Sequence, residues 1–395
     1  MSRLDELIQR HCHDGVEHFL LGDLEDAGRI KLGRGNVISK ADMQSCPGDY
    51  PVYSSAATNN GMIGKYGKYM FSDERISWSI DGGGMFFYRN DEHYSITNVG
   101  GWLKVLDSNI STRYLYHALL SEWSKKKYDY VHKAHPSVIR VEYTIPVPPL
   151  PVQEEIVRIL DTFTELEAEL AQELAHRKLQ YTFYRDQLLN FEKEVSAVKT
   201  IEELCFVYTG GEAPIDCVDT PDDEHPYAVY GNGKDVYGYS GKYKIDRPAV
   251  TISSIGANTG AVYYRDALFT PIVRLKVVVP KGNNLLDRYL YHALSATKIK
   301  SKNGGIPNMN ADEIKKLQIP VPSLDVQERL VEVLDNFDTI CSSLSIGLPA
   351  EIAARESQYN YYRDVLLNYA ATGKLNASAQ SVERERERER EMSSR

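Results

Sequence analysis

The sequence predicts an α+β protein built from two copies of one unit, each a mixed block followed by a long helical region. IPVPPLPVQEEIVRILDTF (145–163) recurs 174 positions later as IPVPSLDVQERLVEVLDNF (319–337). QYTFYRDQLLNF (180–191) recurs as QYNYYRDVLLNY (358–369), with eight of twelve positions identical. The stretches before these segments have Gly- and Asn-rich turns and short Tyr-rich runs, which are typical of strands. A repeat at this period therefore sets the architecture.

Each shared segment is predicted to be a long helix. The prolines at its start favour an extended entry, and apolar residues then recur every three or four positions. About 40 helical residues would span roughly 60 Å, and this spacing favours coiled-coil-like packing. In the second copy, IGLPAEI (346–352) predicts a break into two helices. The candidates for packing between helices and for docking a partner are Ile156, Leu160, Phe163, Tyr181, Tyr184, Leu188, Phe191, Leu330, Leu334, Phe337, Tyr359, Tyr362, Leu366 and Tyr369.

The mixed blocks contain both strand and helix signals. AVTISSIGA and LKVVVP are strand candidates, whereas RYLYHAL is predicted to be helical and occurs twice, at 113–119 and 288–294. SIDGGGMFFYR (79–89) resembles SIGANTGAVYYR (254–265) with one insertion. The shared helical segments match far better than the blocks that precede them.

Composition indicates an ordinary globular protein of the cytoplasm. Apolar residues make up 42% and charged residues 26% of the 395 residues. The charged N-terminus lacks a signal-peptide pattern, and no apolar run approaches the length of a membrane span. Five scattered cysteines favour reduced thiols. The net charge of −9 is concentrated in the two helical regions, so a DNA-contacting surface elsewhere is not excluded.

The sequence carries no motif for catalysis or for a metal. No P-loop is present, and no Ser/His/Asp or Cys/His arrangement has a supporting motif. HCH at 11–13 resembles half of a metal site but lacks a second cluster at ligand spacing. DGGG at 81–84 is more typical of a tight turn than of a cofactor loop. The chain is therefore predicted not to be an enzyme, with no metal and no cofactor of its own.

Polar and basic loops in both blocks are candidates for nucleic-acid contact. Amide, hydroxyl and ammonium groups reach base edges and phosphates. For any single residue, a solvated loop or helix face is an equally good interpretation, and only the occurrence in both blocks favours DNA. The candidates are Ser54, Ser55, Thr58, Asn59, Asn60, Lys65, Lys125, Lys126, Lys127, Lys133, Asn232, Lys234, Lys298, Lys300 and Lys302.

IPVPPLPVQEEIVRILD, QYTFYRDQLLNF and IGLPAEIAARESQYNYYRDVLLNY resemble the conserved regions of the Type I restriction–modification DNA specificity subunit. The resemblance covers all but the last two dozen residues. It implies target-recognition domains at 1–144 and 195–318. It also implies helical spacers at 145–194 and 319–371, packed as an antiparallel coiled coil with a pseudo-twofold repeat.

The resemblance further implies the partners of the chain. These are double-stranded DNA, two methyltransferase subunits and restriction subunits that act as motor and nuclease, with no membrane. S-adenosylmethionine, ATP and Mg²⁺ would belong to those subunits. The predicted architecture suits this role, because two similar domains on a stiff spacer bind two sites at a fixed separation.

The last segment, 372–395, departs from the family pattern. Its SVERERERERE is a charge-balanced run typical of disorder or of a frayed helix. Strict Glu–Arg alternation is also what a GAGAGA nucleotide tract encodes, which suggests phase variation of the gene. Two alternatives for the whole chain remain. One is a protein–protein scaffold with two binding modules on a coiled coil. The other is a stand-alone methyltransferase, for which the Asn/Asp-Pro-Pro-aromatic motif is absent.

Overall fold

The computed structural model describes residues 3–12, 15–56, 59–91, 93–129, 131–189, 197–256, 258–297, 309–343 and 345–372. The chain divides into two compact units. The first unit is Met1–Glu169 with Ile352–Arg395, and the second is Leu170–Glu351. The Glu–Arg tail lies outside the described residues. In the part of the chain that the structure describes, no helix has both the length and the apolar character needed to cross a bilayer.

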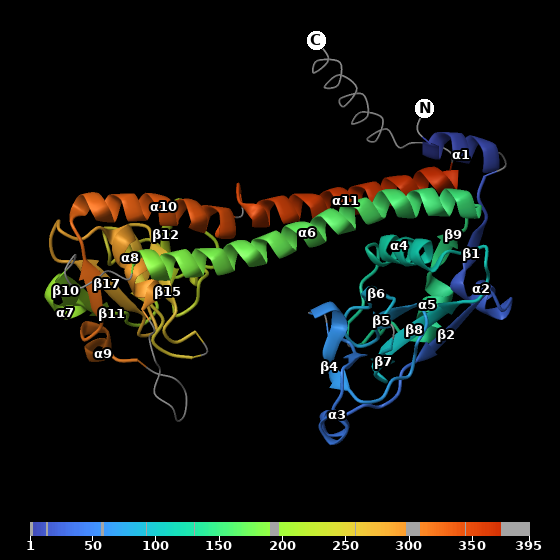
Figure 1. The fold of residues 1–395 in the computed structure, drawn as a ribbon, viewed down its shortest axis with the longest axis horizontal. Helices are drawn as coiled ribbons and strands as arrows, with labels where there is room; N and C mark the ends of the chain where they lie inside the picture. Colours follow the sequence, from blue (N-terminus) through green and yellow to red (C-terminus); the bar gives the residue numbers. More distant parts are fainter. Residues whose placement is uncertain are drawn as a thin grey trace, which may run out of the picture. The chain divides into compact units, whose positions relative to one another are not determined.

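The first unit combines a mixed block with parts of two long helices (Figure 1). Its elements are α1 (Arg3–His11), β1 (His18–Leu20), α2 (Leu21–Asp26), β2 (Ile30–Arg34), α3 (Lys40–Ser45), β3 (Tyr50–Tyr53), η1 (Asn59–Gly61), β4 (Met62–Tyr66), β5 (Arg75–Ser79), β6 (Phe86–Arg89), β7 (Ser95–Ile96), β8 (Gly100–Val105), α4 (Thr112–Trp123), α5 (Pro136–Glu142) and β9 (Thr144–Pro146), then α6 (Leu150–Leu188) up to Glu169 and α11 (Leu348–Thr372) from Ile352 onward.

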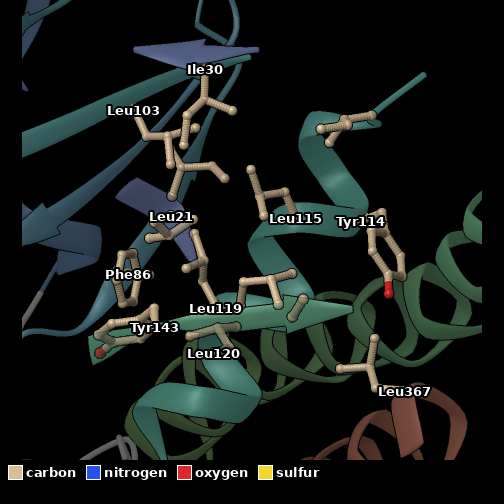
Figure 2. Packing of buried hydrophobic residues seen from close by; sticks show 14 of the residues in the cluster. Leu21, Ile30, Phe86, Leu103, Tyr114, Leu115, Leu119, Leu120, Tyr143 and Leu367 are labelled. Carbon is tan, nitrogen blue, oxygen red and sulfur yellow. The ribbon is translucent and has the colours of Figure 1, made fainter. Parts of the chain in front are cut away.

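The core of the first unit lies between a sheet and α4. The larger sheet has the order β2-β8-β5-β6, and a smaller one has the order β4-β3-β7. Figure 2 shows side chains of α4, including Leu115, packed toward Ile30 and Leu103 of the sheet. Tyr114 of α4 and Leu367 of α11 belong to the same apolar cluster. The mixed block and the long helices therefore share one core.

The second unit repeats this plan (Figure 1). Its elements are the remainder of α6, β10 (Ala197–Thr200), α7 (Ile201–Leu204), β11 (Cys205–Thr209), β12 (Tyr227–Tyr230), β13 (Gly238–Ser240), β14 (Ala249–Ile252), β15 (Val262–Arg265), β16 (Phe269–Pro271), β17 (Lys276–Pro280), α8 (Asp287–Ala296), α9 (Ala311–Lys315), β18 (Gln318–Val321) and α10 (Leu324–Ser342).

The strand orders show that the repeat extends through the mixed blocks. The sheets of the second unit run β11-β17-β14-β15 and β13-β12-β16, which match β2-β8-β5-β6 and β4-β3-β7 strand for strand. The parallel pair β3–β7 in the first unit corresponds to the parallel pair β12–β16 in the second. The α+β repeat predicted from short sequence matches is therefore confirmed.

The long helices pack antiparallel in each unit. In the first unit, the ring of Phe163 in α6 stacks on Tyr362 of α11, with centroids 5.2 Å apart. Four residues further along α6, Glu167 has a pKa raised by burial and by the nearby Glu356, which precedes Tyr362. In the second unit, Tyr184 of α6 stacks on Phe337 of α10 at 6.2 Å. The predicted antiparallel helix packing is confirmed.

The second helical region is broken where the sequence predicts. α10 ends at Ser342 and α11 begins at Leu348, whereas α6 is continuous over 39 residues. Gly347 lies so close to α10 that a Cβ there would come within 2.5 Å of the Thr339 carbonyl oxygen. Only glycine permits this close approach.

A buried glutamine fixes each mixed block to its helix. The Oε1 atom of Gln153 accepts a hydrogen bond from the Ser111 amide at 2.9 Å, just before α4. Its Nε2 atom donates to the carbonyls of Asn109 and Pro148 at 2.9 and 2.7 Å. In the second unit, Gln327 makes the same bonds with Leu286, Asn284 and Pro322. The repeated VQE of the sequence thus positions the RYLYHAL helix in both units.

Candidate nucleic-acid interface

Three loops of the first unit are held together at one end of its strands. The β3–β4 loop (54–61) is closed by a hydrogen bond from the Ser54 amide to the Gly61 carbonyl at 2.9 Å. Thr97 in the β7–β8 loop (97–99) donates from Oγ1 to the Ser54 hydroxyl at 2.7 Å. The Val99 carbonyl accepts from the Ser55 hydroxyl at 3.2 Å and from the Ile80 amide of the β5–β6 loop (80–85) at 3.0 Å. Side chains of the predicted contact loop thus fix its position.

The second unit holds its loops in the same way. In the β12–β13 loop (231–237), Asn232 donates from Nδ2 to the Val273 carbonyl at 2.5 Å. Its Oδ1 atom accepts from the Ser254 amide at 2.7 Å, in the β14–β15 loop (253–261). The Ser254 hydroxyl donates to the Arg274 carbonyl at 2.7 Å, in the β16–β17 loop (272–275). Three loops therefore converge in this unit as well.

The two loop clusters share an equivalent anchoring position. Tyr53 pairs with Ile96 and Tyr230 pairs with Pro271 in the matching parallel strands. Ser55 and Asn232 each lie two residues after these tyrosines and therefore occupy equivalent positions in the two loops. Ser79 donates from its hydroxyl to the Ser55 carbonyl at 3.4 Å, and Ser253 donates to the Asn232 carbonyl at 2.7 Å. The fold thus presents one arrangement of loops twice, with different side chains.

Several of the predicted contact residues make hydrogen bonds to neighbouring loops of their own unit. Both ends of the Asn232 amide are engaged within its own unit, and the hydroxyls of Ser54 and Ser55 also bond to the β7–β8 loop. Their sequence neighbourhood gave no sign of these partners, because the partners lie 22 to 44 positions away. These side chains hold the loops in place.

Other predicted residues are exposed on the loops. Asn59 and Asn60 are exposed and have φ of 52°, a left-handed conformation that asparagine tolerates better than most residues. Lys234 is exposed on the β12–β13 loop. Lys65 is exposed on β4 and pairs with Asp49 at 3.3 Å. Amide and ammonium groups at these positions are accessible to a ligand.

The basic stretch after α4 is partly neutralised. Lys125 pairs with Glu122 at 2.6 Å, and Lys133 pairs with Asp81 of the β5–β6 loop (80–85) at 2.9 Å. Lys126 lies over the ring of Tyr143, with Nζ 5.0 Å from its centroid, and Lys127 is exposed. Exposed ion pairs of this kind contribute little to stability. Thr58, Lys298, Lys300 and Lys302 lie outside the described residues.

The structure adds residues that the sequence did not single out. Arg34 donates from Nη2 to the Asn98 carbonyl at 2.6 Å and so supports the β7–β8 loop. Arg274 is exposed beside the bonded loops of the second unit, with φ of 59°, and Val273 before it has φ of 50°. A β-branched residue rarely adopts positive φ, and such strain tends to gather at binding sites. Nothing in the sequence signals this conformation.

The predicted metal half-site gains no further support. His11 and Cys12 are near the end of α1, whereas His13 lies outside the described residues. No group of three or more potential metal ligands occurs within the described ranges.

A second site joins each mixed block to both long helices. In the first unit, His117 of α4 lies between the Tyr359 hydroxyl, 2.8 Å from Nδ1, and Asp161 Oδ1, 3.4 Å from Nε2. Arg113 donates to Asp161 at 2.8 Å. Asp161 belongs to the first copy of the shared segment and Tyr359 to the second. The first unit is therefore assembled from both copies.

In the second unit the two copies of the shared segment exchange roles, so that the first copy supplies the tyrosine and the second supplies the aspartate. His292 lies 3.2 Å from the hydroxyl of Tyr181 in α6 and 2.7 Å from Asp335 in α10. Arg288 pairs with Asp335 at 2.5 Å. His292, like His117, has a pKa that is lowered mainly by burial. The repeated tyrosine of QYTFYRD and QYNYYRD thus contacts the mixed block of the opposite copy.

Protonation of His117 is expected to destabilise the first unit. Burial lowers its pKa below the ordinary 6.5, so the unfolded chain binds a proton first and stability falls as pH drops below about 6.5. The pKa of Asp161 is also low, because contacts from His117 and Arg113 outweigh its burial. A His117→Gln variant should lose this part of the decrease in stability as pH falls below about 6.5.

Urea unfolding followed by tryptophan fluorescence tests this expectation, because all three tryptophans of the chain lie in the first unit. His292→Gln, in the second unit, is the matched control and should leave the fluorescence-detected curve unchanged. Equal pH dependence in wild type and His117→Gln would contradict the expectation.

The predicted helix residues divide between the core and the surface. Tyr184 and Leu188 are exposed, whereas Leu189 is buried. Phe191 lies outside the described residues. The buried or partly buried candidates are Ile156, Leu160, Phe163, Tyr181, Leu330, Leu334, Phe337, Tyr359, Tyr362, Leu366 and Tyr369.

Comparison with known proteins gives a consistent result. A family model described as the Type I restriction modification DNA specificity domain matches residues 14–176 and 193–354. The putative type I specificity subunit S.MpnORF507P of Mycoplasma pneumoniae is 34% identical over 365 residues, covering 89% of this chain and 98% of that protein. The EcoR124I/EcoR124II specificity subunit of Escherichia coli is 32% identical over 299 residues, covering 68% of this chain and 69% of that protein.

Solved structures share the fold. The S subunit of a Type I restriction–modification system from M. genitalium gives a TM-score of 0.54 at 16% identity, covering 89% of this chain and 95% of that one. A chain from a study of complex assembly in the type I system gives 0.56 at 14% identity, covering 91% and 98%. With the family model matched in both copies, the chain belongs to the family of Type I restriction–modification DNA specificity subunits, which supply DNA sequence recognition rather than catalysis.

Proposed function

We propose that this chain reads a DNA target in two parts, one with each mixed block, and holds its partner subunits on the shared helices. The duplicated loop cluster carries this proposal. The same hydrogen-bonded scaffold presents Asn59 and Asn60 in one unit and Lys234 and Arg274 in the other. Equal scaffolds with unlike exposed side chains suit two recognition sites of different sequence.

The proposed domains follow the repeat. Residues 1–144 and 195–318 are the two target-recognition domains, and 145–194 and 319–371 are the helical spacers. Residues 372–395 form a separate tail. The candidate contact residues are those exposed on the loops, whereas Ser54, Ser55 and Asn232 position them. A scaffold without DNA contact is the weaker alternative, because family membership favours DNA recognition.

The proposed partners are two methyltransferase subunits and restriction subunits that act as motor and nuclease. The use of equivalent tyrosines, Tyr181 and Tyr359, at equivalent histidines supports two matching docking positions. S-adenosylmethionine, ATP and Mg²⁺ would be bound by those subunits. We place the chain in the cytoplasm, where its DNA target lies.

Exchange of residues 1–144 for the same block of another specificity subunit tests the two-part reading. The expected result is a new sequence in one half of the methylated motif with the other half unchanged, because each block has its own loop cluster. Methylome sequencing of cells that carry the full complex measures this. A change in both halves, or in neither, would count against separate reading.

An exposed apolar face on α6 is the proposed docking position in the second unit. Leu179 and Phe183 are four residues apart on one face of the helix and are both exposed. Replacing both by serine should weaken co-purification of the methyltransferase by about tenfold or more, since truncated aromatic anchors dominate interface energies. Phe206→Ser is the matched control, because Phe206 is a similarly exposed residue on β11 of the same unit. Equal loss with the control variant would argue against this surface.

A further inference from the structure

Each unit buries one arginine beneath the loop that follows its Tyr-bearing central strand. Arg89 ends β6 and Arg265 ends β15. They hold the same register, Arg89 opposite Arg75 and Arg265 opposite Ala249. Arg89 is 1% exposed and Arg265 is 6% exposed. A charged side chain this deeply buried needs partners inside the fold.

In the second unit those partners are backbone atoms of the β12–β13 loop. Arg265 donates from Nη1 to the Lys234 carbonyl at 2.6 Å and from Nη2 to the Gly233 carbonyl at 2.7 Å. Its guanidinium lies over the ring of Tyr230, 3.9 Å from the centroid. The planar fork of arginine suits two adjacent acceptors, and hydrogen bonds from a charged donor are strong. One side chain thus fixes two successive peptide groups.

The first unit repeats the stacked arrangement. Arg89 lies over the ring of Tyr53, 3.5 Å from the centroid, and donates from Nε to the Ser77 hydroxyl at 2.8 Å. Burial lowers its pKa to about 10, so it stays charged at neutral pH. A Cβ on Gly61 would lie 3.1 Å from Nη2 and 3.6 Å from the Ala56 carbonyl, which places the guanidinium beneath the β3–β4 loop. Among the described residues, Nη1 and Nη2 have no hydrogen-bond partner.

We infer that Arg265 is a positioning residue that sets the backbone of the DNA-reading loop in the second half through its two hydrogen bonds, and that Arg89 supports the matching loop of the first half by packing beneath it. This inference rests on the proposed function. At 1% and 6% exposure neither guanidinium can reach a phosphate, so the arginines act through the loop. The carbonyls of Gly233 and Lys234 face Arg265, and in planar trans peptides the following N–H groups face the opposite way. The loop therefore presents the N–H groups of Lys234 and Asp235 outward, and outward N–H groups are regular phosphate contacts.

The test uses the full chain assembled with its methyltransferase subunits and DNA substrates that carry single base changes in either half of the methylated motif. Arg265→Met fills most of the space without donating hydrogen bonds. It should reduce discrimination by about tenfold or more in the half read by 195–318 and raise KM for DNA, with the other half unchanged. Arg89→Met should reduce discrimination only in the half read by 1–144, and by less than Arg265→Met does in its own half, because Nη1 and Nη2 of Arg89 donate no hydrogen bond to a described residue. Arg265→Lys keeps the charge but not the fork and should give an intermediate loss.

Arg247→Met is the control, because Arg247 is exposed in the same unit and pairs with Asp246. Hydrogen exchange of β12 and β14 shows whether the variants remain folded. Folded variants with unchanged discrimination, or with equal loss in both halves, would overturn the inference. A loss of complex without altered discrimination in the remaining folded fraction would also overturn it. If the wild-type complex shows no two-part sequence preference, the proposed function itself fails.

Discussion

Replacing Leu334 by alanine is expected to lower the free energy of unfolding of the second unit by about 2–5 kcal/mol. Leu334 of α10 is 0% exposed and belongs to the core cluster that includes Leu290 of α8 and Ile252 of β14. Removing its branched end leaves a cavity that close-packed neighbours only partly fill. Hydrogen exchange of β14 and β17 measures this change, because both strands lie in the same unit.

The adjacent residue provides the control. Val333 is 43% exposed on the same helix, and Val333→Ala should change stability by no more than about 0.5 kcal/mol. Equal exchange protection in Leu334→Ala and wild type would show that Leu334 is not a core residue.

Replacing Gly35 by alanine is expected to destabilise the first unit by about 1–3 kcal/mol or more. A Cβ at Gly35 would lie 1.9 Å from the Ile96 carbonyl oxygen and 2.4 Å from that of Thr97. Backbone atoms cannot yield as a flexible side chain does, so the β7–β8 loop or the end of β2 has to move. Because this loop holds Ser54 and Ser55 through Thr97 and Val99, the displacement should also weaken recognition in the first half of the target.

Tryptophan fluorescence during urea unfolding measures the stability, and methylation of substituted DNA measures the recognition. Gly210 bonds from its amide to the Leu275 carbonyl at 2.7 Å, as Gly35 does to Gly100 at 3.1 Å. Its Cβ would meet the Pro271 carbonyl carbon at 2.8 Å, so Gly210→Ala should act on the second half. Gly282→Ala, in the same unit as Gly210, is the control for Gly210→Ala in the methylation measurement, since nothing lies within 4 Å of its Cβ. Wild-type behaviour of Gly35→Ala would contradict this account.

Much of the fold follows from local patterns in the chain. The prolines before Leu150 and Leu324 mark the starts of α6 and α10, and Gly347 marks the break in the second region. Matching heptapeptides identified α4 and α8 as equivalent helices. These signals survive in a single sequence because they depend on residues a few positions apart.

The phase of the long helices was harder to predict. The apolar pattern points to Leu188, but Leu189 enters the core. Both residues are leucine, so the periodicity near the end of α6 does not distinguish them. The choice depends on which face meets the mixed block, and that is decided by packing against other elements.

In the candidate interface, too, the sequence predicted some features and the tertiary structure was needed for others. The polar, Gly- and Asn-rich composition of the sequence identified the β3–β4 and β12–β13 loops as polar and exposed. It did not reveal that Asn232 is engaged by Val273 and Ser254, or that Arg265 lies beneath the loop. The recurrence of arginine at the end of FFYR and VYYR is the one signal that was available. A repeated charged residue at the end of a strand is worth testing for a buried role.

The sequence by itself determined the duplication, the alternation of mixed blocks with long helices, and the family. Only the tertiary structure decided which residues position the loops and which are exposed on them. It also showed that each unit uses a tyrosine from the opposite copy, as Tyr359 does at His117 across 242 positions. The physical reason is that periodicity and proline act over a few residues, whereas burial and hydrogen-bond satisfaction depend on neighbours that folding brings together.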